Sequence, residues 1–158
     1  MDGDEAFYYL NKDGQPLGGV ITYVNDFNMA GDPEFVEKVL SVVERELTVS
    51  KIEEDTFRFT GLDIKVVTDG IKISMEGYSQ NLKDIQEIRK VDDRNEELSK
   101  VEMKLYRKMT SKIAWLANST RPDLCYLALQ MSKKNQGATI ADLREVNRIL
   151  KRVRERES

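Results

Sequence analysis

The chain has 158 residues, of which 40% are hydrophobic and 34% are charged, a length that supports one compact domain or two small ones. Its apolar runs are far shorter than the ~20 residues that cross a membrane, and its acidic beginning is the reverse of a signal peptide. We expect an intracellular protein, cytoplasmic or nuclear, with no membrane partner.

Cys125 alone cannot form an internal disulfide, and a chain without histidine has no Cys/His zinc site or His-based triad. Because Cys125 lies in an apolar stretch, we expect a buried, inert thiol.

The two halves of the chain carry opposite net charge. Residues 1–99 contain 11 basic and 22 acidic side chains, whereas residues 100–158 contain 14 basic and 6 acidic ones. This asymmetry fits two different binding partners, and it equally fits two solvated surfaces of opposite sign. Both interpretations stay open at the level of composition.

The first half has the pattern of hairpins followed by a helix. Residues 6–10 and 17–24 read as strands around a turn that contains Asp13-Gly14, and Asn25-Asp26 reads as the two-residue turn before another strand at 27–30. Asp32 and Pro33 are suited to cap and open a helix that extends to about residue 47.

A further hairpin is predicted from residues 56–67 and 70–75, and we expect it to join the first strands in one small sheet. The strand alternation in 56–67 slips by one position at Gly61. A glycine at that point indicates a bulge or a close approach of another backbone.

The second half has helical periodicity. Residues 79–90 carry Leu82, Ile85 and Ile88 at helical spacing, and the charged residues 91–98 read as a linker and a domain boundary. Ser99 to Glu102 has the spacing of a capping box, with Leu98 and Met103 as its hydrophobic staple, for a helix that ends near residue 118.

Two more helix starts are predicted at Thr120 and Thr139. The helix over 139–154 has an apolar face and an opposite basic face. The apolar face consists of Leu143, Val146, Leu150 and Val153, and the basic face consists of Arg144, Arg148, Lys151 and Arg152. The basic face is either a solvated surface or a surface that follows nucleic-acid phosphates.

Several short motifs, in the same order along the chain, resemble one family. They are Tyr23-Val24-Asn25-Asp26, the segments 57–64, 70–74, 77–78 and 105–107, the block Trp115-Leu116-Ala117 followed by Thr120-Arg121-Pro122-Asp123, and the segments 138–143 and 147–150. Together they are similar to the C-terminal portion of copia-type (Pseudoviridae-like) retrotransposon reverse transcriptases. The similarity spans about residues 4–153.

The resemblance implies an α+β fold, in which a small antiparallel palm-like sheet with a packed helix precedes an all-helical unit. Residues 1–90 would be a partial palm with a primer-grip-like hairpin and the first following helix, 91–98 a linker, and 99–158 a thumb- and connection-like domain. It also implies nucleic acid as a partner and Mg²⁺ as the cofactor of the parent family. The implied nucleic-acid contacts are Phe59, Gly61, Arg121, Arg144, Arg148, Lys151 and Arg152.

The chain departs from the family at the catalytic turn. The family presents Tyr-Val-Asp-Asp there, whereas this chain has Tyr23, Val24, Asn25 and Asp26. A carboxamide contributes no charge to a cation, so Asp26 would be a weak metal ligand by itself. The other essential aspartate of the family would lie before residue 1.

We therefore expect a truncated or decayed fragment of an RNA-directed DNA polymerase that is inactive by itself and holds no metal tightly. The alternative is a retained, non-catalytic module that binds nucleic acid or a protein. Weak binding of an RNA–DNA hybrid or duplex, and a homodimer formed through exposed palm strand edges, are the expected interactions.

Overall fold

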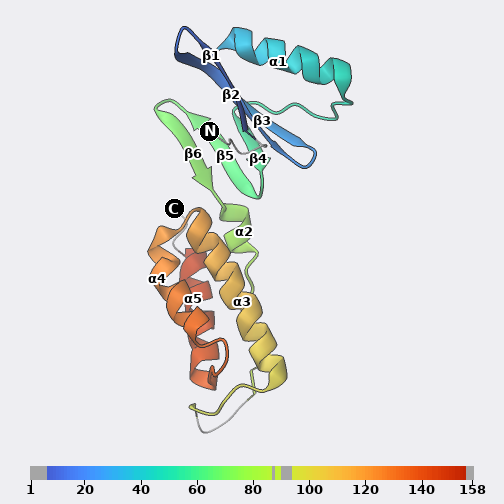
Figure 1. Cartoon of the computed structure of the whole chain (residues 1–158). Coiled ribbons are helices and arrows are strands. Elements are labelled where there is room, and N and C mark those ends of the chain that lie inside the picture. The colour runs from blue at the N-terminus through green and yellow to red at the C-terminus, as the bar shows by residue number, and fades with distance from the viewer. Residues whose placement is uncertain (1–6, 87, 90–93, 156–158) are drawn as a thin grey trace. The chain divides into compact units, whose positions relative to one another are not determined.

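The computed structural model describes residues 7–86, 88–89 and 94–155. Within these residues the fold is α+β, as predicted, with two three-stranded antiparallel sheets and five α-helices (Figure 1). The chain forms two compact units: residues up to 60 together with 64–71 make the first, and 61–63 together with 72 onward make the second. Their division does not coincide with the boundary predicted at 91–98, of which residues 91–93 lie outside the described part.

The first sheet has the order β1-β2-β3 and forms from two tight hairpins, β1 (Phe7–Lys12), β2 (Gln15–Tyr23) and β3 (Asp26–Gly31). Asp13 and Gly14 join β1 to β2 with φ values of 53° and 79°. Two consecutive positive φ angles match the twist of the flanking strands, and Asp-Gly adopts them at low cost. The predicted Asp-Gly turn is confirmed.

Helix α1 (Pro33–Glu46) packs on the first sheet because two glycines leave room for a phenylalanine ring. Gly18 and Gly31 are cross-strand partners on β2 and β3. A Cβ atom would lie 2.2 Å from the Phe35 ring at Gly18 and 2.7 Å from it at Gly31. Asp32 occupies the N-cap position and Pro33 the first turn, as predicted, although the Asp32 side chain makes no capping hydrogen bond.

The second sheet corrects the prediction of one sheet with a long strand over 56–67. That segment is two strands, β4 (Thr56–Phe59) and β5 (Leu62–Val67), which pair with β6 (Gly70–Ser74) in the order β4-β5-β6. Thr60 and Gly61 have φ values of 50° and 87°, so the chain reverses there in a two-residue turn. The slip in alternation at Gly61 marks a reversal of the chain, where we predicted a bulge.

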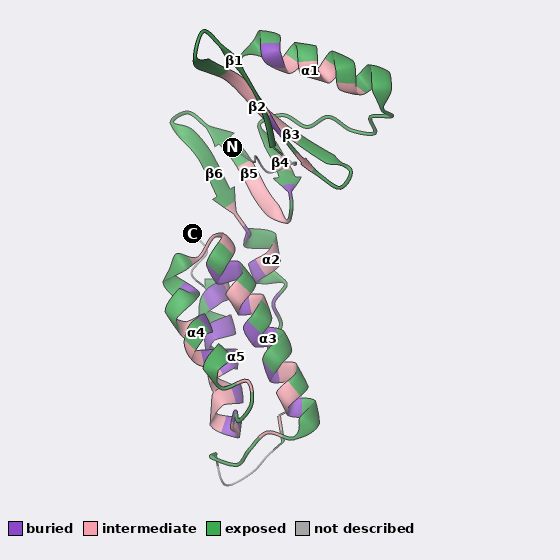
Figure 2. Ribbon diagram, in the orientation of Figure 1, coloured by how far each residue is buried: buried purple, intermediate pink, exposed green. Residues whose placement is uncertain are grey.

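The second unit contains a short helix, α2 (Glu76–Gln80), and the main helices α3 (Lys100–Ser119), α4 (Cys125–Lys133) and α5 (Ile140–Glu155), with a 3₁₀ turn at Pro122–Leu124. Buried residues lie on the faces that α3, α4 and α5 turn toward one another (Figure 2). The confirmed apolar face of α5, Leu143, Val146, Leu150 and Val153, is fully buried.

A buried tyrosine joins two of these helices. The hydroxyl of Tyr106 on α3 donates to the carbonyl oxygen of Met131 on α4 at 2.9 Å. Burial, with a smaller contribution from the Asp142 charge, raises the pKa of Tyr106 to about 12. The hydroxyl is therefore a neutral donor at neutral pH.

The segment after α2 corrects the prediction of a helix over 79–90. The chain is not helical from 81 to 89 among its described residues, yet Leu82 and Ile85 are buried in the core. Side chains of α5 satisfy its backbone: Asn147 bonds both polar groups of Ile85, and Arg154 donates to the carbonyl oxygen of Leu82 at 2.6 Å. Apolar residues three positions apart can face one core from an irregular chain as well as from a helix, so their spacing alone did not establish a helix.

The described part of the predicted linker, residues 94–98, also forms backbone hydrogen bonds with the rest of the second unit. The N–H groups of Ile140 and Ala141 donate to the carbonyl oxygens of Glu96 and Arg94, and that of Leu98 donates to the carbonyl oxygen of Ala138. Residues 94–98 thus pair with the beginning of α5, and a charged composition alone does not make this stretch a free linker.

The predicted helix caps are confirmed at two of three positions. Ser99 and Glu102 form the reciprocal capping box of α3. Thr139 and Asp142 do the same for α5, with the Thr139 hydroxyl donating to the Asp142 carboxylate at 2.8 Å. Thr120 instead ends α3, and the 3₁₀ turn after it has no side-chain cap. The predicted burial of Cys125 is wrong, because this cysteine is exposed at the first residue of α4.

Candidate functional site

The turn between β2 and β3 is the candidate catalytic position suggested by the sequence. Tyr23 and Asp26 are the last cross-strand pair of the hairpin, and Val24 and Asn25 form the two-residue loop. The predicted loop, Asn25-Asp26, is therefore displaced by one residue. Val24 has a φ of 55° and is 86% exposed, an uncommon conformation for a β-branched residue.

The donor set of this turn does not fit a pair of divalent cations. Asn25 and Asp26, both exposed, offer one carboxamide and one carboxylate, whereas Mg²⁺ in phosphoryl-transfer sites is held by carboxylates around an octahedral shell. In the part of the chain that the structure describes, no group of three or more His, Cys, Asp or Glu side chains could hold a metal ion.

The residues predicted to contact nucleic acid in the hairpin of the second sheet lie at the turn between β4 and β5. Phe59 ends β4 and is buried. Gly61 lies in the turn itself, and a Cβ atom there would meet nothing within 4 Å. The positive φ of Gly61 explains the glycine by conformation, without a close approach of another backbone.

The predicted basic face of α5 is largely accessible, since Arg148, Lys151 and Arg152 are exposed and Arg144 is half-buried. Arg148 pairs with Glu145 at 2.8 Å, and Lys151 lies 3.8 Å from Glu155. Exposed pairs of this kind contribute little, on the order of 0–1 kcal/mol. A polyanion could displace both acidic partners at low cost.

Arg121 is positioned differently from the other predicted basic contacts. Its guanidinium makes a two-pronged ion pair with the Asp123 carboxylate, both N–O distances being 2.8 Å. The pair fixes the chain at the start of the 3₁₀ turn that leads into α4. The structure thus separates Arg121 from the basic face of α5.

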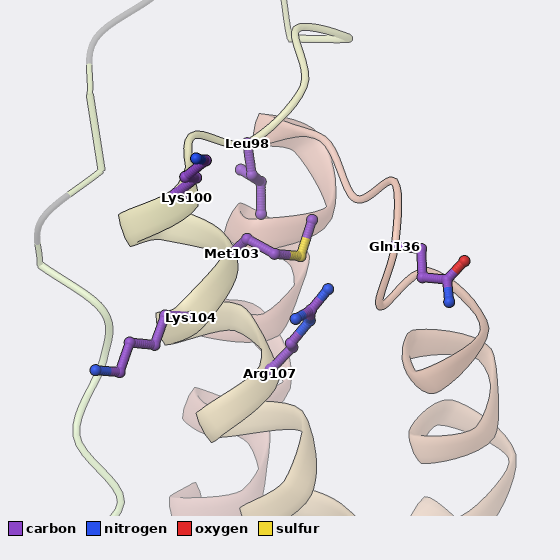
Figure 3. A pocket seen from close by; sticks show the side chains of 6 residues that line it. All are labelled: Leu98, Lys100, Met103, Lys104, Arg107 and Gln136. Carbon is purple, nitrogen blue, oxygen red and sulfur yellow. The ribbon is translucent and has the colours of Figure 1, made fainter.

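The sequence reasoning missed a basic groove beside α3. It has a volume of about 400 Å³ and is lined by Leu98, Lys100, Met103, Lys104, Arg107 and Gln136. Met103 and Arg107 point from α3 toward the loop that carries Gln136, whereas the Lys104 ammonium points to the other side (Figure 3). The signal for this groove in the sequence is the spacing of the basic residues along α3.

No protein-family model, no curated protein and no solved structure matches this chain. No helix among the described residues combines the length and the apolar character that crossing a membrane requires.

Proposed function

We propose that the chain corresponds to a C-terminal portion of a copia-type retrotransposon reverse transcriptase and does not polymerise DNA by itself. The observation that carries this proposal is the β2–β3 hairpin. Its two-residue loop lies within Tyr23-Val24-Asn25-Asp26, the segment that resembles the family's catalytic turn. The helix that follows, α1, packs on the same sheet, as the resemblance to a palm implies.

The proposed inactivity rests on the charge of the turn. A two-metal phosphoryl transfer needs enough carboxylates to hold two divalent ions, and Asp26 is the one carboxylate within residues 23–26. Asn25 supplies a neutral oxygen, which gains far less from a cation than a carboxylate does. Any Mg²⁺ bound there is held weakly.

A second candidate function is a non-catalytic nucleic-acid-binding module. The accessible basic face of α5 favours it, because four basic side chains spaced along one helix face suit the phosphates of an RNA–DNA hybrid or duplex. Such binding is weak and independent of sequence. The net charge of +8 over residues 100–158 adds long-range attraction.

A mobility-shift titration with an RNA–DNA hybrid tests the binding function. Retention of the hybrid at low salt and steep loss of retention as salt rises are expected, because each neutralised phosphate releases counterions. A variant with Arg144, Arg148, Lys151 and Arg152 replaced by Gln should lose most of the shift. If the hybrid shows no mobility shift even at low ionic strength, the basic face of α5 is only a solvated surface.

Self-association is proposed through the first sheet. Among the described strands, β1 and β3 each have one edge without a strand partner, and such edges invite pairing with another chain. Tyr9 and Tyr23 are also exposed on this sheet. Size-exclusion chromatography with light scattering should give a mass near twice 18.2 kDa; a monomer at high protein concentration would refute the dimer.

A further inference from the structure

The outer face of α3 carries a continuous row of positive charge. At 100° per residue, the basic side chains of this helix fall within a sector of about 140° on the side away from the core. They are Lys100, Lys104, Arg107, Lys108 and Lys112. The row follows the helix for about three turns, since each turn advances 5.4 Å.

No acidic side chain of α3 lies among these charges. Glu102 is the one acidic residue of the helix, and it is buried. Its carboxylate accepts from the Ser99 N–H at 2.9 Å and from the Arg89 Nε at 3.1 Å. The acid is thus withdrawn from the surface, and the row keeps its positive potential.

An exposed tryptophan continues the row. Trp115 falls at the centre of the basic sector, two turns beyond Lys108, and is 50% exposed. Half-exposed indole leaves a large apolar surface in water. A flat aromatic ring next to a row of cations is the arrangement by which proteins stack an unpaired base while holding its phosphates.

The groove at the other end of the row adds apolar surface. Leu98 and Met103 line it together with Lys100 and Arg107, as Figure 3 shows. The Arg107 Nε donates to the carbonyl oxygen of Asn135 at 2.8 Å, which fixes this guanidinium beside the groove. Cationic and apolar groups therefore lie side by side there as well.

We propose that this outer face of α3 binds single-stranded nucleic acid, with phosphates on the lysine and arginine row and a base stacked on Trp115. A duplex offers its phosphates to the row, but its bases are stacked on one another and cannot cover the indole. The face therefore binds a single strand more tightly than a duplex. The inference does not rest on the proposed function, since it concerns a different helix face and an unpaired strand.

Intrinsic fluorescence of the full chain tests the proposal, because Trp115 is the only tryptophan. Titration with an oligothymidylate at low salt should quench the emission to saturation, and a duplex of equal length should quench it less. Addition of salt should reverse the quenching. The α5 variant with four Gln substitutions should keep the quenching, which separates this face from that of α5.

Variants locate the site. Using a labelled oligonucleotide and anisotropy, Trp115→Ala should weaken single-strand binding about 5-fold or more, while Trp115→Phe should retain most of it. Lys104→Gln combined with Lys108→Gln should weaken single-strand and duplex binding alike. Tyr126→Ala, which removes an exposed aromatic ring of α4, is the matched control and should leave affinity unchanged.

Several outcomes would overturn the proposal. They are the absence of quenching by the single strand, an equal loss of single-strand and duplex affinity in Trp115→Ala, and a loss as large in Tyr126→Ala. Tighter binding to vesicles of anionic lipid than to the oligonucleotide would assign the face to a lipid surface instead. Far-UV circular dichroism of each variant confirms that the helices are retained, and the fluorescence titration of the parent chain with single strand and duplex carries the test if Trp115→Ala unfolds.

Discussion

The carboxamide of Asn147 satisfies both backbone polar groups of Ile85, accepting from its N–H at 2.8 Å and donating to its carbonyl oxygen at 2.9 Å. A side chain of α5 thus takes the place of a neighbouring strand for an irregular segment. Ile85 itself is buried in the core. This contact explains how the described residues between 81 and 89 contribute apolar side chains without being a helix.

Removal of the Asn147 carboxamide should destabilise the second unit. Asn147→Ala leaves the Ile85 N–H and carbonyl without partners, and each such group costs about 1–3 kcal/mol when it stays buried. Urea unfolding followed by circular dichroism should show a loss of about 2–6 kcal/mol for the two groups together. Asn118→Ala, at an exposed position of α3, should change the free energy of unfolding by less than about 0.5 kcal/mol. Equal effects of the two substitutions would contradict the role of Asn147.

Stability should fall in acid partly through Glu102. Burial acts to raise the pKa of this carboxyl, but the hydrogen bonds from Ser99 and the nearby Arg89 charge outweigh burial, and its pKa is lowered from 4.5. A lowered pKa in the folded state contributes stability above the unfolded value that is lost as the pH falls through the folded value. Urea unfolding of Glu102→Gln should show a smaller change in the free energy of unfolding between about pH 5 and pH 3 than urea unfolding of the parent chain.

A second carboxyl provides the control for Glu102. Burial acts to raise the pKa of Asp142, while bonds from Lys134 and Thr139 lower it overall. Asp142→Asn should therefore lose the part of the acid sensitivity that comes from Asp142 and keep the part that comes from Glu102. A variant that combines Glu102→Gln with Asp142→Asn should lose both parts. Parallel stability curves for the parent chain and Glu102→Gln would show that the capping carboxylate is not a source of acid sensitivity.

The packing of α1 should depend on the absence of a side chain at Gly18. A methyl group there would lie 2.2 Å from the Phe35 ring and 2.8 Å from the carbonyl oxygen of Ala30, so Gly18→Ala should cost about 1–3 kcal/mol by overpacking. Thermal unfolding would report the loss. Gly77→Ala, in α2 with nothing within 4 Å, should be neutral or stabilising. A neutral Gly18→Ala would mean that α1 does not rest on this pair of strands.

Restoring the acidic turn should not create a polymerase. Asn25→Asp adds one carboxylate beside Asp26, so the turn offers two carboxylates and remains short of charge for two cations. A primer-extension assay with Mg²⁺ or Mn²⁺ is expected to show no template-dependent incorporation by the parent chain or the variant. Incorporation by either protein would disprove the assignment of the turn as inactive.

Local signals in the sequence predicted the elements that local chemistry determines. The Ser99 and Thr139 capping boxes follow from side chains that bond backbone groups within one turn. The Asp13-Gly14 turn follows from the positive φ angles that Asp-Gly adopts at low cost, and the start of α1 follows from Pro33. The segment 81–89 could not be predicted in this way, because its backbone partners come from α5, more than 60 residues away. The reversal at Thr60-Gly61 was missed because a slip in alternation is common to bulges and turns.

The candidate site was also predictable in part, where it depends on the periodicity of one helix. The basic face of α5 followed from helical periodicity, and α5 buries its opposite face as expected. The burial of Phe59 and the ion pair of Arg121 were beyond the sequence, since both depend on neighbours brought together by the fold. The row on α3 was within reach of the sequence, because its basic residues recur on one helical face and Glu102 is the one acidic residue of the helix.

The division of the chain into two units limits where the chain can be cut into fragments. The boundary crosses the chain three times, between residues 60 and 61, between 63 and 64, and between 71 and 72. A single cut therefore cannot separate the units without taking strands from the second sheet. Fragments made for expression or isotope labelling should keep β4, β5 and β6 together on one piece, because a strand removed from a three-stranded sheet leaves a hairpin of marginal stability.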